Sequence, residues 1–569
     1  MSGGATRRMR VAAAAALAAL FVFRLGFGLS SEFFFEDETQ VFLIGLKHYA
    51  TGAWPFFGAD VVWTKSEIPG ALQGLLVGVP LTVVPAPESP FVLLNLLSFT
   101  AICALAWYVK RRLPWLPAWL VWGWFLTVPW TLQFSTHIIN PSYVLAGAVL
   151  FFVGFFEAVP IFSTGAIGAA TAHFMMGAGL TWVMQVHMSW PLLLPYSAWA
   201  WWSRRADGGR ALVRDAAAYL AGALVPGVLL LPTVVTYGAS GGSGGVFRNL
   251  HVGWVNPAVA VNTLARFLSF ASLEISRFIE TDGAKRLEFF SRHLWLVPLA
   301  GLVWLVGILQ PFWMLVEVIR PARRWPHPET AAQWRAMRWI LLDSILIVYA
   351  SYWFVMEPPQ AHAFYVLAPI ALCLAAYCWT FVDSRRMRAG AATVLAMNVV
   401  FHAGLAIAQA PEKSLYKRRD VVVAAIQTRQ PEVLGHRRPF AIDAGPYQLS
   451  AATPHDPGHD VVVRSAVYSR RAGSAVHWTV TVANLNPRVA YRDLLYFATY
   501  RSAGGVETVR HEFIKDILRA CESRVVDLND GYVTTPFDAA SFRVVAAEAL
   551  VPSDTRWCQP ASQLSERMR

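Results

Sequence analysis

Residues 141–160 read PSYVLAGAVLFFVGFFEAVP, twenty residues in which Glu157 is the only charged side chain. A helix of about 20 apolar residues spans the hydrocarbon core of a bilayer. Comparable runs recur at roughly residues 11–29, 90–109, 115–134, 164–183, 188–203, 215–236, 293–319, 339–356, 362–382 and 389–410. The pattern predicts a mainly α polytopic membrane protein with about eleven transmembrane helices.

The composition of the 569-residue chain agrees with this fold class. Hydrophobic residues make up 56% and charged residues only 15%, whereas a soluble protein carries about 25% charged residues. Collagenous, disordered and small disulfide-rich classes are excluded. The net charge of +12 does not indicate nucleic-acid binding, because the Lys and Arg residues fall mostly between the apolar runs.

The basic residues set the predicted topology. Short loops rich in Lys and Arg stay in the cytoplasm, and eighteen such residues fall in residues 1–10, 110–112, 204–214, 320–338 and 385–388. A further run, 68–86, would place the later basic loops outside if it crossed. We therefore predict that this run lies on or dips into the outer surface. The whole chain then has a cytoplasmic N-terminus and an outer C-terminus. A cleaved signal peptide is the alternative for residues 1–30.

From about residue 411 the pattern changes to that of strands. Val476, Trp478, Val480 and Val482 alternate with polar residues, and a second alternation covers residues 494–500 before Gly504 and Gly505. Such alternation is typical of half-buried strands joined by a hairpin. We predict a membrane domain over residues 1–410 and an extracytoplasmic, mostly β, sandwich-like domain over 411–569, with residues 412–438 as a helical connector.

The cysteines divide into two groups. Cys103, Cys373 and Cys378 lie in apolar spans, where buried thiols are ordinary. Cys521 and Cys558 are the two in the tail, and an oxidising outer compartment would let them form a disulfide. No CxxC, HExxH, Walker or GxGxxG pattern appears in a supporting context, so no metal-binding residues and no cofactor are identified, and dependence on a divalent metal stays open.

Near its start, the first outer loop, residues 31–89, has three aromatic residues at 33–35 and then three acids, Glu36, Asp37 and Glu38. One interpretation is an interfacial aromatic belt followed by a solvated charge run. The other is functional, because three neighbouring carboxylates raise one another's pKa unless a cation or substrate compensates, and catalytic bases occur in such clusters.

This loop carries a resemblance to a known superfamily. The order of its features resembles the GT-C superfamily, and within it the protein O-mannosyltransferases and lipid A aminoarabinose transferases. The similarity extends to about residue 410 and is strongest over 31–190. The matching positions are the acidic pair Asp37 and Glu38 after the first span, then Tyr49, Trp54 and Pro55, then Lys65 before Pro69.

The resemblance implies an inverting sugar transfer on the outer face from a polyprenyl-phosphate donor. Asp37 would deprotonate or orient the acceptor, with Glu38 beside it, and Lys65 would hold the donor phosphate. Lys65 as a merely solvated residue is the alternative. Arg24, inside the first span, is named with Lys65 as a candidate for binding the donor phosphate. Snorkelling, or pairing with Glu36 or with a lipid phosphate, are the other expectations for it.

Further polar residues are expected at the same depth as the acidic cluster. Many relatives carry an acid in the second outer loop, where this chain has His137 and Asn140, so a mechanism with two carboxylates is in doubt. The remaining pocket candidates at the outer ends of spans are Gln185, His187, His362 and Tyr365. The outer loop 237–292 begins with several glycines, and its basic helix is predicted to lie on the surface or to form a lid.

The preferred function is a glycosyltransferase of a bacterial inner membrane that acts on the periplasmic side. Its partners would be a polyprenyl-phosphate-linked sugar, a cell-envelope glycan, lipid or protein acceptor, and membrane lipids. A secondary transporter and a non-catalytic binder of lipid-linked glycans are the alternatives. Glu157, Glu317 and Asp343, near the cytoplasmic ends of spans, are interpreted as structural.

Overall fold

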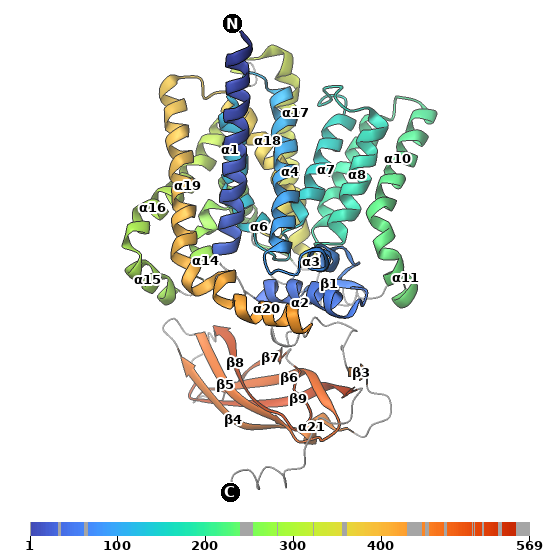
Figure 1. Cartoon of the computed structure of the whole chain (residues 1–569), viewed down its shortest axis with the longest axis vertical. Helices are drawn as coiled ribbons and strands as arrows, with labels where there is room; N and C mark the ends of the chain where they lie inside the picture. The colour runs from blue at the N-terminus through green and yellow to red at the C-terminus, as the bar shows by residue number, and fades with distance from the viewer. Residues whose placement is uncertain are drawn as a thin grey trace. The chain divides into compact units, whose positions relative to one another are not determined.

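The computed structural model divides the chain into two compact units, Met1–Leu434 and Gly435–Arg569. It describes all residues except 1, 32–35, 62–65, 239–253, 281–282, 322–323, 355–360, 430–446, 450–454, 471–474, 503–504, 506, 515–516, 533–536 and 553–569. The first unit is helical and the second is built of strands (Figure 1).

The helical unit also contains one small hairpin, and η marks a short 3-10 helix. In chain order its elements are α1 (Ser2–Ser30), α2 (Glu36–Thr51), β1 (Phe57–Val61), β2 (Ser66–Pro69), α3 (Leu72–Val83), α4 (Ser89–Arg112), α5 (Ala118–Thr127), α6 (Pro129–Ser135), α7 (Val144–Ala158), α8 (Ala169–Met184), η1 (Trp190–Leu193), α9 (Leu194–Ser203), α10 (Gly209–Gly227), η2 (Val228–Leu230), α11 (Leu231–Tyr237), α13 (Ala258–Ser269), η3 (Ser272–Glu274), α14 (Ile275–Ile279), α15 (Gly283–Arg292), η4 (Leu294–Leu296), α16 (Val297–Ile319), η6 (Pro328–Thr330), α17 (Ala331–Ser351), η7 (Tyr352–Phe354), η8 (Tyr365–Leu367), α18 (Ala368–Trp379), α19 (Arg385–Lys413), η9 (Leu415–Arg418) and α20 (Arg419–Thr428).

Helices occupy all eleven predicted apolar runs, but fewer of them have the length of a membrane span. Within the described residues, six helices are long and apolar enough to cross a bilayer, or seven if the bent pair α13 and η3–α14 forms one span. Pro129 starts a new helix and so divides the run 115–134 into α5 and α6. Helix α7 has 15 residues, about 22 Å of helix, which is less than the ~30 Å core. The chain is an integral membrane protein, and the count of eleven spans stays a prediction.

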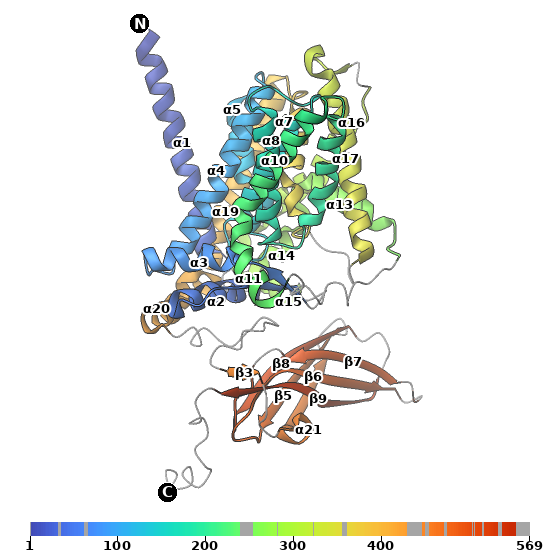
Figure 2. The ribbon, with the colours of Figure 1, turned by 90° about the vertical axis from the view of Figure 1, so that its right-hand side faces the viewer.

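The ambiguous run 68–86 forms α3, which has 12 residues. A helix of this length measures about 18 Å and is too short to cross a bilayer. Figure 2 shows α2 and α3 lying across the ends of the long helices rather than along them. Helix α3 packs on α2 and on the start of α4, so α1 and α4 run in opposite directions without a crossing between them.

Glycine allows α8 and α10 to approach closely. A Cβ atom on Gly177 would lie 1.9 Å from the carbonyl oxygen of Tyr219, and one on Gly222 would lie 2.0 Å from that of Phe174. Small residues at such contacts are how helices pack in a membrane, where burial of apolar surface supplies little driving force. Any side chain at either position would push the two helices apart.

The segment after α11 differs from the predicted surface helix or lid. Helix α13 and the η3–α14 segment meet at an angle of 101°, and the corner residues Phe270 and Ala271 have φ values of 51° and 60°. Both corner residues are completely buried, and α13 packs against α16 and α17. The segment contains Arg266 and Arg277, but the side chains around these arginines are apolar. Burial of these apolar side chains places the segment in the core rather than on the surface.

The second unit consists of β3 (Tyr447–Leu449), α21 (Pro457–Asp460), β4 (Val461–Arg470), β5 (Ala475–Asn484), β6 (Ala490–Arg501), β7 (Glu507–Ile514), β8 (Ser523–Tyr532) and β9 (Ala539–Pro552). Its described strands form one sheet in the order β3-β9-β6-β7 and another in the order β4-β5-β8. All the strand pairs are antiparallel.

The two sheets share one apolar core. Val476, Trp478, Val480 and Val482 are buried, as the alternation predicts, and so are Leu494, Tyr496, Ala498 and Tyr500 of the second strand. The indole N–H of Trp478 in one sheet donates to the hydroxyl of Tyr500 in the other at 2.7 Å. The predicted hairpin joins β6 to β7 with Arg501 opposite Glu507.

The helical connector belongs to the first unit. Its residues Leu415, Val422, Ala425 and Ile426 lie in the main apolar core of the helical unit. The contacts therefore divide the chain after Leu434 rather than after residue 410.

We expect non-reducing peptide mapping to find Cys521 linked to Cys558, because Cys521 is disulfide-bonded while Cys103, Cys373 and Cys378 are free. Cys558 lies outside the described residues. The three membrane cysteines serve as the internal control, since they should be alkylated after denaturation without reductant. Alkylation of Cys521 and Cys558 under the same conditions would contradict the predicted pair.

Candidate functional site

The acidic cluster opens α2. Glu36, Asp37 and Glu38 occupy the first turn of this helix, and their side chains lie outside the described part of the chain. Lys65, between β1 and β2, also lies outside it. What the structure describes is the framework that holds these two positions, and it consists of α2, the β1–β2 hairpin and α3.

A buried glutamine fastens this framework to the second outer loop. Gln73, at the start of α3, is fully buried. Its Oε1 accepts from the backbone N–H of Ala59 at 2.9 Å, and its Nε2 donates to the carbonyl oxygen of Asn140 at 3.4 Å. Glu67 of β2, two residues after Lys65, is also buried, with 2% of its surface exposed. Sequence reasoning missed both side chains.

Two candidate site residues lie in the second outer loop. The side chain of the first has hydrogen-bond partners, and the side-chain oxygen of the second has none among the described residues. His137 is buried, with its Nε2 2.9 Å from the hydroxyl of Ser31 and its Nδ1 3.1 Å from the carbonyl oxygen of Gln133. The side-chain oxygen of Asn140 is buried and accepts no hydrogen bond among the described residues. An unpaired buried acceptor is costly, and a hydroxyl-bearing ligand would satisfy it.

The end of α8 meets the same framework. Gln185 is fully buried and donates from Nε2 to the carbonyl oxygen of Pro226 at 2.7 Å. A Cβ atom on Gly70 would lie 2.6 Å from Gln185 Oε1, and Gly70 has a φ of 105°, so only glycine fits there. His187 follows two residues later, with its Nδ1 2.8 Å from the hydroxyl of Ser189.

The corner between α13 and η3 adds an ionic group. Glu274 Oε1 accepts from Arg266 Nε at 2.9 Å and from the backbone N–H of Ala361 at 3.2 Å. Arg277 lies near the same carboxylate, is half-buried, and makes no hydrogen bond or ion pair with any other described residue. The segment that contains Ala361 continues to His362, so this ionic group lies next to that pocket candidate.

Two neutral histidines adjoin these cations. Burial lowers the pKa of His362 to about 3, and the nearby His187, Arg277 and Arg266 act in the same direction. Burial lowers the pKa of His187 to about 4. Both imidazoles are therefore uncharged near pH 7, so each ring can donate one hydrogen bond and accept another.

Tyr365 and Arg24 have internal roles. The hydroxyl of Tyr365 bonds the hydroxyl of Ser135 at 2.5 Å, and both residues are buried. Arg24 is fully buried and donates to the carbonyl oxygens of Leu126 at 2.7 Å and Thr131 at 3.1 Å. The predicted snorkelling of Arg24 is wrong, because these carbonyls hold its guanidinium inside the helical unit. We therefore leave Arg24 out of the donor site.

The described candidates thus come together at one end of the long helices. Asn140 touches Gln73, Gln185 faces Gly70, and His187 neighbours His362. Glu274 and its two arginines, missed as a site from sequence, join this group. The available signal was an acid flanked by Arg266 and Arg277 in an otherwise apolar segment, since charges in such segments normally have a paired or functional role. Within the described residues no group of His, Cys, Asp and Glu could hold a metal ion.

Solved structures that are similar to the chain include the following two. One is ArnT from Cupriavidus metallidurans in the apo state, with 11% identity and a TM-score of 0.39 over 76% of this chain and 78% of that one. The other is the arabinosyltransferase EmbB from Mycobacterium smegmatis, with 11% identity and a TM-score of 0.35 over 95% of this chain and 64% of that one. No family model and no curated protein matches the chain. At these identities and TM-scores the two likenesses carry no argument about activity, so the chain's own residues must carry that assignment.

Proposed function

We propose that this chain is a glycosyltransferase that moves a sugar from a polyprenyl-phosphate donor to a cell-envelope acceptor, with inversion at the anomeric carbon. The observation that carries the proposal is Arg277, a half-buried guanidinium without a described hydrogen-bond acceptor, beside Arg266 and two neutral histidines. This group adjoins the framework that bears Asp37 and Lys65.

The two arginines suit a phosphate group. A guanidinium offers several N–H donors in a fixed plane that matches phosphate oxygens. Among the described residues, Glu274 pairs with Arg266, and no acceptor bonds the N–H donors of Arg277. Together with Lys65, these cations would stabilise the charge that develops on the departing phosphate.

The acceptor side of the proposed reaction uses Asp37. An acceptor hydroxyl oxygen attacks the anomeric carbon and its proton goes to the Asp37 carboxylate, with Glu38 beside it. The bond from the anomeric carbon to the phosphate oxygen breaks, and the electron pair leaves with polyprenyl phosphate. Base and leaving-group stabilisation then act on opposite faces of the sugar. Asn140 Oδ1, His187 and His362 are available to hydrogen-bond sugar hydroxyls.

The proposed orientation places this site and the second unit on the periplasmic side of a bacterial inner membrane. A phosphatase reporter that folds only outside the cytoplasm should therefore be active when it is fused after Arg569. Fusions after Arg112 and after Arg388, in loops predicted to be cytoplasmic, should be inactive and serve as controls. An active control fusion or an inactive C-terminal fusion would contradict the orientation.

Deleting the gene and profiling envelope glycans and lipid-linked sugars tests the proposed function directly. A transferase predicts loss of one envelope modification and accumulation of its lipid-linked donor, and purified protein should restore the product from that donor. A transporter predicts that purified protein makes no product in detergent. A non-catalytic binder of the donor is the second candidate function, because Asn140 stands in a loop where many relatives carry an acid. Such a protein would bind the donor without turnover.

A further inference from the structure

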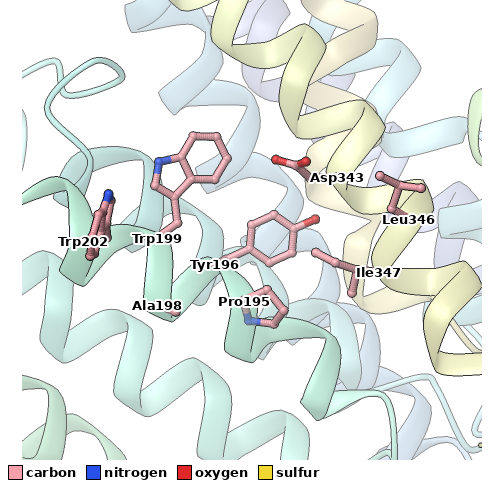
Figure 3. Close-up of a pocket in the computed structure, with 8 residues that line it drawn as sticks. All are labelled: Pro195, Tyr196, Ala198, Trp199, Trp202, Asp343, Leu346 and Ile347. Carbon is pink, nitrogen blue, oxygen red and sulfur yellow. The ribbon is translucent and has the colours of Figure 1, made fainter.

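A groove lies between α9 and α17. It has a cavity volume of about 510 Å³, and the side chains that carry the argument are Tyr196, Trp199 and Trp202 from α9 and Asp343, Leu346 and Ile347 from α17. Figure 3 shows the Asp343 carboxylate pointing into the space between the two helices, toward the rings of Tyr196 and Trp199. Trp202 and Leu346 are 66% and 52% exposed, so the groove opens at the surface of the helical unit.

Asp343 differs from the other two acids that the sequence places near span ends. Glu157 accepts hydrogen bonds from Tyr108 at 2.7 Å and from the backbone N–H of Thr164 at 3.0 Å, and Glu317 pairs with Arg320 at 2.8 Å. Asp343 forms no hydrogen bond or ion pair with any described residue. The sequence interpretation of all three as structural therefore fits Glu157 and Glu317 but not Asp343.

An unpaired carboxylate on a membrane helix requires a partner. A charged side chain within a membrane span is costly unless it is paired, and lipid hydrocarbon supplies no hydrogen-bond donor. The hydroxyl of Tyr196 is not available as a donor to Asp343, because it is hydrogen-bonded to the hydroxyl of Ser344 at 2.7 Å. The occupant of the groove must therefore bring a donor of its own, and a positive charge suits the carboxylate best.

The aromatic walls of the groove also suit a cation. An ammonium group is attracted to the faces of Trp and Tyr rings, and aromatic cages with a nearby acid recognise such groups. Here three aromatic side chains and one carboxylate line the same space. The remaining lining from Leu346 and Ile347 is apolar, as an alkyl chain would need.

The position of the groove along the helices points to a lipid headgroup. Trp202 stacks with Arg205, whose guanidinium carbon lies 4.1 Å from the ring centre, at the end of α9 that is predicted to face the cytoplasm. Asp343 lies five residues beyond Arg338, about 7.5 Å along α17. The groove thus begins at the level of the basic residues, which suit a lipid phosphate, and reaches inward to the acid.

We propose that the groove between α9 and α17 binds a phospholipid with an ammonium headgroup, with the ammonium on Asp343 among the rings and the acyl chains along Leu346 and Ile347. This site is independent of the proposed sugar transfer. It fills the gap beside α9, which has only 10 residues.

Native mass spectrometry of the full chain in detergent tests the proposal, with a phosphatidylethanolamine and a phosphatidylglycerol of identical acyl chains as probes. Wild-type protein should retain the ethanolamine lipid at least about tenfold more strongly than the glycerol lipid. Asp343→Asn should lower that retention about tenfold or more, because the amide keeps an acceptor oxygen but loses the negative charge that pairs with the ammonium. Glu317→Gln, an equivalent acid-to-amide change outside the groove, should retain the lipid as wild type does.

A thermal-unfolding series guards against a folding defect. Added ethanolamine lipid should raise the unfolding temperature of wild type and of Glu317→Gln but not of Asp343→Asn, because only a bound ligand stabilises the folded state. Trp199→Leu keeps the acid and removes one ring, and should weaken retention about threefold or more. Equal retention of both lipids by wild type, absence of retention, or unchanged retention by Asp343→Asn and Trp199→Leu would each overturn the proposal.

Discussion

Replacing Asp37 with asparagine should lower sugar transfer by a factor of about 10² to 10⁴, the contribution usual for general acid–base catalysis by one side chain. Asparagine has nearly the same size as aspartate but accepts no proton near pH 7. The position lies in the first turn of α2, so the change removes the base and leaves the helix-forming sequence otherwise intact. Product formed per minute by purified protein from a radiolabelled polyprenyl-phosphate sugar is the measurement.

Asp207→Asn is the matched control for this variant. Asp207 lies between α9 and α10, pairs with Arg204 at 2.6 Å, and stands on the predicted cytoplasmic side. Its replacement should leave the transfer rate within about twofold, because an exposed ion pair contributes little. Undiminished product from Asp37→Asn at equal expression would remove this carboxylate from the chemistry.

Replacing Arg277 with glutamine should raise the KM for the lipid-linked donor by about tenfold to a hundredfold. The physical reason is the loss of a charge-assisted hydrogen bond to phosphate, worth about 1.5–3 kcal/mol. Arg277→Lys should restore part of the affinity, since lysine keeps the charge without the planar fork of donors. Initial rates measured over a range of donor concentrations separate the effect on KM from that on kcat.

Arg286→Gln supplies the control for donor binding. Arg286, on α15 in the same outer segment, donates to the carbonyl oxygen of Glu280 at 2.8 Å and has no place in the proposed site. Its variant should keep the wild-type KM. If Arg277→Gln and Arg286→Gln behave alike, the cation that receives the phosphate lies elsewhere.

The length of apolar runs and the alternation of apolar residues were sufficient to predict helices in the eleven runs and the strands around Trp478 and Tyr496. The run 141–160 becomes α7, and the alternation around Trp478 becomes a strand with that indole in the core. Periodicity could not predict the corner at Phe270 and Ala271. Two successive left-handed residues without glycine are unfavourable for any isolated chain, so they arise only from tertiary contacts such as the bond from the backbone N–H of Trp130 to the carbonyl oxygen of Phe270 at 3.0 Å.

The residues of the candidate site also divide into those that the sequence could predict and those that depend on tertiary contacts. Polar residues at span ends, such as His187 and His362, were identifiable because they interrupt apolar runs at a similar predicted depth. Glu274 and Gln73 were not, because their partners, Ala361 and Asn140, are distant in sequence. Arg24 was identified as unusual, but its carbonyl partners at Leu126 and Thr131 depend on how α5 and α6 fold back onto α1.

The corner at Phe270 and Ala271 also determines whether Arg266 and Arg277 lie close together. In a straight helix, eleven residues would separate Arg266 from Arg277 by about 16 Å along the axis, whereas here both lie by one carboxylate. Each left-handed residue costs about 1–3 kcal/mol, which the surrounding helices must offset. A peptide excised from this segment would therefore lack the paired cations, and homologues that share the charges would share the pair only if they also share the bend.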